Sequence, residues 1–263
     1  MIPLFLISLT SIFFTNQHSK QTIETSIEQS IDETIARLEN DFSHLYQLGA
    51  EFISQSNVRK VADMQSFITR YEQANTINTL REQQTSLCQA NNYLVNLVVY
   101  YRDLEKAYNA NLNNNASFFE FSESEWINEI CSPTTAGRYY YHNGYIITKI
   151  KPAINASYLC ELQIDLNQIW HTLGHPLQTY SFECVIELPD GTILKNHSSS
   201  IGPNKKDKNT LYFERTLSAL DANIYFFITS ELLFQQESTL FRMASLLLGC
   251  IILAVFIFTL GTT

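Results

Sequence analysis

Residues 16–56 read NQHSKQTIETSIEQSIDETIARLENDFSHLYQLGAEFISQS and carry a continuous apolar seam. Hydrophobic side chains recur three or four positions apart, the spacing that gathers them on one face of an α-helix. They are Ile23, Ile27, Ile31, Ile35, Leu38, Phe42, Leu45, Leu48 and Phe52. Because no proline interrupts the run, about forty residues rising ~1.5 Å each predict a rod of roughly 60 Å. The seam either covers the body of a domain or pairs with a second copy, and both roles can hold along different stretches.

Apolar runs lie at both ends of the chain. The run Met243–Leu260 is uncharged and long enough to cross a bilayer, which takes about 20 mostly apolar residues. The run Ile2–Phe14 is shorter, but no Lys or Arg precedes it and no small-x-small cleavage site follows, so we interpret it as a shortened span rather than a signal peptide. We therefore expect transmembrane helices at 1–15 and 241–261, with residues 16–240 outside the cytoplasm. A chain with no output module on the inner side is expected to be a fragment of a longer receptor.

The charge and the motif content of the region between the two apolar runs exclude several classes of partner and function. The net charge of −9 argues against nucleic acid, because phosphate binding needs clustered cations. The nearest basic cluster, Lys205, Lys206 and Lys208, lies beside Pro203 and Asn204, which favours a solvated loop. No P-loop, GxGxxG, GxSxG or HExxH motif occurs in the sequence, so we expect neither an enzyme nor a bound cofactor.

Cysteine and histidine leave two alternatives open. Outside the second apolar run the cysteines are Cys88, Cys131, Cys160 and Cys184, and their spacing is equally compatible with one or two disulfides or with four free thiols. His171 and His175 are four apart, a spacing that can place two imidazoles on one metal. Gly174 and Pro176 indicate that the helix ends there, which favours the interpretation without a metal.

Beyond residue 57 the pattern predicts short helices and then two groups of strands. In the first group, β-branched and aromatic residues predict strands at 93–101 and 157–166, and His142-Asn143-Gly144 predicts a tight hairpin. Ser122 and Glu125 have the spacing of a helix capping box. In the second group, Pro189-Asp190-Gly191 joins two strands, and two more strands meet near Asp221.

This order of elements resembles the double Cache sensor region of bacterial two-span receptors. The likeness rests on a span, a long helix, a larger α/β lobe, a smaller lobe with the LPDGTIL turn (188–194), and YFFITSE (225–231) leading into a second span. The chain looks most like the outer regions of Gram-positive sensor histidine kinases and membrane-bound AraC-type regulators. The resemblance implies an α+β fold: a long N-terminal helix with two stacked PAS-like antiparallel-sheet lobes, flanked by two transmembrane helices. The membrane-distal lobe would be 57–168 and the membrane-proximal lobe 169–236.

The resemblance also implies ligand-binding residues in the membrane-distal lobe. Amino-acid-binding members use an Arg followed by paired aromatics and a later acidic residue, which match Arg138, Tyr140, Tyr141 and Asp165 here. The family's Trp is Tyr140 in this chain, and the family's upstream Tyr has no clear match. A guanidinium would take a ligand carboxylate through two parallel bonds. The alternative is that Tyr139–Tyr141 are ordinary strand residues with Arg138 in solvent.

Two functions follow as expectations. The first is a homodimeric receptor at the cell membrane, whose outer region binds an unknown small molecule and transmits binding through the second membrane helix to a cytoplasmic output module. A ligand can shift such a receptor only by its differential affinity for two states. The second is a membrane-anchored structural or protein-interaction domain that has no small-molecule ligand.

Overall fold

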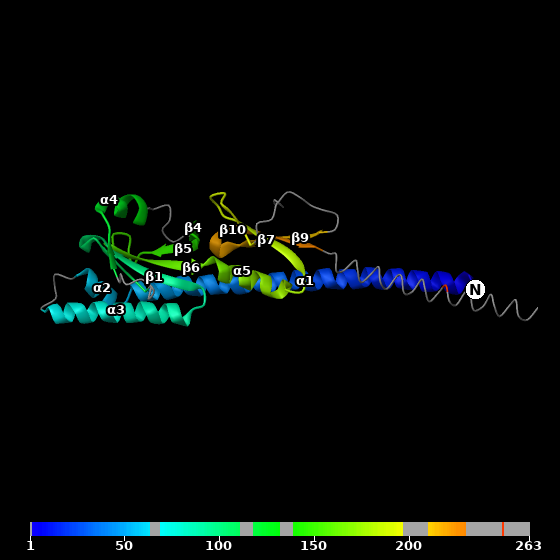
Figure 1. Cartoon of the computed structure of the whole chain (residues 1–263), viewed down its shortest axis with the longest axis horizontal. Helices are drawn as coiled ribbons and strands as arrows, with labels where there is room; N and C mark the ends of the chain where they lie inside the picture. The colour runs from blue at the N-terminus through cyan, green and yellow to red at the C-terminus, as the bar shows by residue number, and fades with distance from the viewer. Residues whose placement is uncertain are drawn as a thin grey trace, which may run out of the picture.

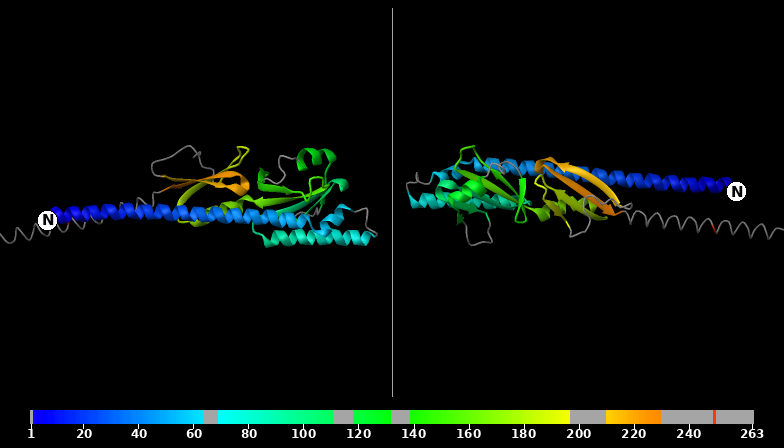
Figure 2. Two further views of the ribbon diagram at one scale, coloured as in Figure 1. Left: turned by 180° about the vertical axis from the view of Figure 1, so that it is seen from behind. Right: turned by 90° about the horizontal axis from the view of Figure 1, so that it is seen from above.

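A single long helix organises the molecule. The computed structural model describes residues 2–63, 69–110, 118–131, 139–196, 210–229 and Gly249. Helix α1 (Ile2–Ile53) is 52 residues long and contains most of the helix expected at 16–56. Two antiparallel sheets follow one another along α1, as both views in Figure 2 show. The chain is therefore an α+β protein with a long N-terminal helix and two antiparallel sheets.

The first sheet lies at the end of α1 that is far from the N-terminus (Figure 1). Its strands are β1 (Leu94–Tyr101), β2 (Lys106–Asn109), β3 (Phe118–Glu120), β4 (Tyr139–His142), β5 (Tyr145–Ile150) and β6 (Tyr158–Asp165). Their order across the sheet is β3-β2-β1-β6-β5-β4. Helices α1 and α3 (Arg70–Ala90) pack on one face, with α2 (Ser56–Ala62) joining them. We call this part, from α2 to β6, the distal lobe, and the face of the sheet turned away from α1 its outer face.

The second sheet forms the proximal lobe, nearer the N-terminus of α1. Its strands are β7 (Ser181–Glu187), β8 (Ile193–Lys195), β9 (Thr210–Leu217) and β10 (Ala222–Thr229), in the order β8-β7-β10-β9. Helix α5 (Leu166–Gly174) and the 3-10 turn η4 (His175–Leu177) connect the two lobes. Both α5 and α1 contact the proximal sheet, through β7 and β9 respectively.

The apolar seam of α1 covers both lobes. Ile27, Ile31, Leu38, Phe42, Leu45 and Phe52 are all less than 4% exposed. They share one hydrophobic core with both sheets, so the apolar face of α1 packs against both lobes. Polar contacts add to this apolar packing: Arg215 of β9 bonds to Glu28 (2.8 Å) and Asp32 of α1. The role of the seam in covering the domain is confirmed, whereas pairing with a second copy stays a prediction.

The predicted turns and cap are present. Asn143 and Gly144 have φ of 48° and 90° between β4 and β5, and Gly191 has φ of 82° between β7 and β8. The Asp190 side chain accepts a bond from the Thr192 amide at 2.8 Å, which closes that second turn. Ser122 and Glu125 form the reciprocal capping box at the start of α4 (Glu123–Glu125).

The two membrane spans expected from the sequence are not seen as such in the described residues. Among the described residues, no helix has an apolar stretch long enough to cross a membrane, although the span expected at 1–15 falls at the start of α1. The span expected at 241–261 lies outside the described residues apart from Gly249.

The structure favours the second of the two alternatives for the cysteines. No disulfide joins the four described cysteines, which are all free thiols: Cys88, Cys131, Cys160 and Cys184.

Gly49 marks the closest approach of α1 to the distal sheet. A Cβ at this position would lie 2.6 Å from Ile150 Cδ1 and 2.9 Å from Leu162 Cδ1. A glycine inside a helix costs about 1 kcal/mol relative to alanine, so its presence here reflects the tight packing against β5 and β6.

We expect Gly49→Leu to lower the free energy of unfolding by about 1–3 kcal/mol, because the added side chain overpacks the core. The measurement is chemical denaturation of the purified full chain. Ala36→Leu, at an exposed position of the same helix, is the control and should stay within about 0.5 kcal/mol of the parent. Equal effects of the two substitutions would contradict the close packing at Gly49.

Candidate functional site

A cavity of about 540 Å³ opens on the outer face of the distal sheet. Strand alternation sends Tyr139, Ile150 and Leu162 toward the core shared with α1, and sends their neighbours Tyr140, Lys149, Glu161 and Gln163 to the other face. The cavity is lined by Tyr100, Glu129, Ile130, Tyr140, His142, Asn143, Tyr145, Ile147, Lys149, Glu161 and Gln163. Its volume is in the range of small-molecule sites.

A second apolar cluster closes one side of this cavity. α4 and the π-helix η3 (Trp126–Ile130) lie over the outer face, opposite α1 (Figure 1). Trp126 and Ile130 pack there against Tyr100 and Leu159 of the sheet. This packing covers the half of the outer face formed by β1 and β2, so the cavity is left over β4, β5 and β6.

Lys149 and Glu161 form a buried ion pair at the base of the cavity. They stand directly opposite each other on β5 and β6. The distance from Lys149 Nζ to Glu161 Oε2 is 3.7 Å, and the two side chains are only 9% and 8% exposed. Burial lowers the pKa of Lys149, and the neighbouring Glu161 acts in the opposite direction.

The remaining bonds of the pair fix its orientation. Lys149 Nζ donates to the Glu129 carbonyl of η3 at 3.0 Å and lies 5.5 Å from the centroid of the Tyr140 ring. Gln163 Nε2 donates to Glu161 Oε1 at 2.8 Å. Each charge is therefore held by the sheet, and the lysine additionally ties the sheet to η3.

Two tyrosines beside the pair are held in the protonated form. Burial raises the pKa of Tyr100, and the Glu161 carboxylate raises it further. The same two causes raise the pKa of Tyr140 to well above its ordinary value. Their hydroxyls can therefore donate hydrogen bonds across the whole physiological pH range.

The arrangement is suited to binding a polar ligand. A buried pair of opposite charges is rarely gained for stability, because desolvation offsets most of its Coulomb energy. Buried charges in a cleft, with perturbed pKa values around them, mark a candidate functional site. Here a cation, a carboxylate and tyrosine hydroxyls face one cavity, which suits recognition of a small molecule with several polar groups.

Three of the four residues that the sequence pointed to are described by the structure, and they have different surroundings. Tyr140 lines the cavity, whereas Tyr141 lies on the opposite face and packs on the main core. The Asp165 carboxylate accepts a bond from the Asn167 amide at 2.8 Å and so caps α5. Arg138 lies outside the described residues. Ligand binding by these four residues stays a prediction, and of the three that the structure describes only Tyr140 lines the cavity.

Sequence reasoning missed Lys149, Glu161, Gln163 and Tyr100. The available signal was a charged residue in the middle of each of two mostly apolar strands: Lys149 in YIITKI (145–150) and Glu161 in YLCELQID (158–165). A charged residue in an alternating strand ordinarily faces solvent, so sequence alone gave no reason to expect a buried pair. The pair is buried because α4 and η3 cover part of that face.

Comparisons with known proteins add two similar structures. No family model matches the chain, and no curated protein matches it. One similar structure is the extracellular domain of a chain described as the histidine kinase soHK1S-Z6, with 10% identity and a TM-score of 0.46 over 83% of this chain and 99% of that one. A second, described as a two-component system protein that mediates signal transduction, has 13% identity and a TM-score of 0.38 over 76% of this chain and 98% of that one. Any function for this chain therefore has to rest on the geometry of its own cavity.

Proposed function

We propose that the chain is the ligand-sensing region of a membrane signalling receptor, and that the outer-face cavity of the distal lobe is its ligand site. The observation that carries the proposal is the buried Lys149–Glu161 pair, which faces an open cavity rather than a packed core. A ligand that offers an anionic group to Lys149 and a donor to Glu161 would satisfy both charges when it displaces water.

The strands under the cavity provide a route from ligand to helix. On β4, Tyr140 faces the cavity while its neighbour Tyr139 donates a hydrogen bond to the Phe42 carbonyl of α1 at 2.8 Å. On β5, Lys149 faces the cavity while its neighbour Ile150 packs against Gly49 of α1. A ligand that shifts β4 or β5 therefore changes the contact with α1, and it biases the receptor by its differential affinity for the two positions.

The full proposal also includes the arrangement in the membrane. The uncharged runs 2–14 and 243–260 support membrane anchors at both ends, with the two lobes outside the cytoplasm. In this arrangement the chain belongs to the double Cache type and works as a homodimer. Its output module would be supplied beyond the second anchor.

The test is thermal unfolding of the purified full chain against a panel of amino acids, organic acids, sugars and short peptides. A ligand at 100 times its dissociation constant should stabilise the protein by about 2.7 kcal/mol. For a protein of this size that corresponds to a shift of the melting temperature by several degrees. Glu161→Gln should abolish the shift produced by the compound that binds, because the carboxylate is lost from the cavity.

Glu120→Gln is the matched control, since Glu120 is an exposed residue on the edge strand β3 of the same sheet. This variant should keep the full ligand-induced shift. A panel in which no compound stabilises the parent protein would contradict the proposal and favour the membrane-anchored interaction domain. If every compound that stabilises the parent protein keeps its full shift in Glu161→Gln, the outer-face cavity is not a ligand site.

A further inference from the structure

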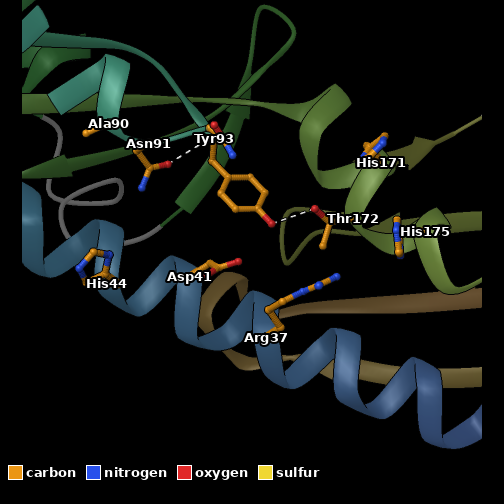
Figure 3. Close-up of a pocket in the computed structure, with 10 residues that line it drawn as sticks. Arg37, Asp41, His44, Ala90, Asn91, Tyr93, His171, Thr172 and His175 are labelled. Carbon is orange, nitrogen blue, oxygen red and sulfur yellow. Dashed lines mark hydrogen bonds between the residues drawn. The ribbon is translucent and has the colours of Figure 1, made fainter. Parts of the chain in front are cut away.

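A second cavity of about 410 Å³ lies at the junction of the two lobes, apart from the outer-face cavity. Three segments that are distant in sequence line it: α1, the connection from α3 to β1, and α5 with η4 (Figure 3). It therefore lies where the helix connecting the lobes passes over the long helix that carries both of them. It shares no lining residue with the outer-face cavity, and of the sequence motifs only the His171/His175 pair lines it.

The α1 wall of the junction cavity carries one charge of each sign. Arg37 and Asp41 are four residues apart and so occupy the same face of the helix, beside the buried seam residues Leu38 and Phe42. Within the described part of the chain, Arg37 takes part in no salt bridge, whereas Arg215 pairs with two carboxylates of the same helix. The guanidinium of Arg37 thus has its bonding capacity available to a ligand.

The wall of the junction cavity opposite α1 carries two hydroxyl groups that are hydrogen-bonded to each other. The Tyr93 hydroxyl and Thr172 Oγ1 are 2.8 Å apart and join the start of β1 to α5. Figure 3 shows Arg37 and Asp41 reaching from α1 toward this pair. Burial raises the pKa of Tyr93, the bond to Thr172 lowers it, Asp41 raises it further, and the Arg37 charge lowers it. Tyr93 therefore remains protonated, and its hydroxyl remains a donor or acceptor for a bound molecule.

The histidines do not turn this cavity into a metal centre. His171 and His175 line the cavity from the α5 side, with ring centroids 6.3 Å apart. Among the described residues, no group of three or more His, Cys, Asp or Glu side chains is arranged to hold a metal ion. A guanidinium without a salt bridge in the described part of the chain, a carboxylate and the two hydroxyls of Tyr93 and Thr172 favour a small organic ligand instead.

We propose that the junction cavity binds a small carboxylate that carries a hydroxyl or ammonium group on the adjacent carbon. Arg37 takes the carboxylate through two parallel hydrogen bonds. Asp41 accepts a hydrogen bond from the hydroxyl or ammonium group, which disfavours anions that lack such a donor. Because the bound molecule touches α1 and α5 together, it sets how firmly the connection between the lobes rests on the long helix.

The test is isothermal titration calorimetry of the full chain with L-lactate, L-alanine and propanoate. Lactate and alanine distinguish the hydroxyl from the ammonium group, and propanoate has the same carbon chain without either. We expect lactate or alanine to bind, with propanoate at least ~10-fold weaker because Asp41 gains no partner. Arg37→Gln should weaken binding at least ~10-fold, and Arg59→Gln, an exposed arginine on α2, should leave it unchanged.

The same titration with the double variant Lys149→Met/Glu161→Leu separates the two cavities. This variant removes the buried ion pair from the outer-face cavity and changes no residue that lines the junction cavity, so binding of lactate or alanine should persist. Loss of binding in the double variant, or full binding by Arg37→Gln, would overturn the proposal by assigning the ligand elsewhere. Absence of binding by lactate and alanine to the parent chain would overturn it too, whatever the panel shows for the outer-face cavity.

Discussion

Glu161→Leu is expected to lower the free energy of unfolding by about 3–5 kcal/mol at neutral pH, because it leaves the Lys149 ammonium buried without its counter-charge. The Glu129 carbonyl remains as a partner at 3.0 Å, but a single carbonyl dipole does not replace a carboxylate. Loss of Glu161 also leaves Gln163 Nε2 without the acceptor that it now has at 2.8 Å. Chemical denaturation of the full chain measures the effect.

The double variant Lys149→Met/Glu161→Leu should recover most of that loss. Replacing a buried ion pair by apolar residues of similar volume is commonly neutral or stabilising, since two desolvation penalties disappear together. The double-mutant cycle therefore predicts strong non-additivity between two residues that face each other across β5 and β6. A double variant as unstable as the single one would show that the pair is structural. A stable double variant that no longer responds to ligand would show that the pair is retained for binding.

The pH dependence of the single variant gives an independent check. Burial lowers the pKa of Lys149 in the folded state below that of an unfolded lysine. In the interval between the two pKa values the unfolded state binds more protons, so stability rises with pH there. With Glu161 removed, the opposing effect of the carboxylate is lost and the interval widens. Glu161→Leu should therefore regain stability relative to the parent as the pH is raised toward about 10.

Much of the fold could be predicted from local patterns. The three- and four-residue spacing from Ile23 to Phe52 predicted α1, and the structure buries that seam. Asn143-Gly144 and Asp190-Gly191 predicted the two hairpins, because few residues other than glycine and asparagine adopt positive φ without strain. These features depend on residues close together in sequence, which is why sequence alone sufficed.

The candidate site depended on contacts that no local pattern contains. Lys149 and Glu161 become a buried pair because η3, some 20 residues earlier, packs over the same face and places a carbonyl on the lysine. Tyr141 could have been separated from Tyr140 by the two-residue period of a strand, which sends neighbours to opposite faces. Asp165 directly precedes the helix 166–174, and a carboxylate there serves first as an N-cap.

Steep loss of stability at alkaline pH is the second large effect that we expect, and it originates in buried thiols. Burial raises the pKa of the partly buried Cys88 and of the fully buried Cys160 to about 12. A group whose pKa is raised on folding contributes its full stability below the unfolded pKa and loses it as the pH rises toward the folded pKa. Each such thiol removes about 1.4 kcal/mol per pH unit above its unfolded pKa near 9, so the two together remove roughly 5 kcal/mol between pH 9 and 11.

Buried tyrosines steepen the same decline. Burial raises the pKa of Tyr100, Tyr101 and Tyr139 above their ordinary value. The Tyr101 hydroxyl donates a hydrogen bond to the Val58 carbonyl of α2, and the Tyr139 hydroxyl donates one to the Phe42 carbonyl of α1. Ionisation of either tyrosine would break its hydrogen bond between the distal sheet and these helices. Above pH 10 the unfolded state loses these protons first, so the folded state is penalised further.

Cys160→Ala isolates the contribution of one thiol in this decline. Cys160 lies fully buried in β6, where its Sγ is 3.7 Å from the Gly49 carbonyl of α1. The substitution costs some packing at pH 7, but the slope of stability against pH between about 9 and 11 should become shallower by about 1.4 kcal/mol per pH unit. Val99→Ala, directly across the sheet at the paired position, creates a comparable void without removing an ionisable group and should keep the full slope. Equal slopes for the two variants would mean that the thiol does not ionise with unfolding, and that the alkaline loss comes from the tyrosine bonds at the junction of sheet and helix.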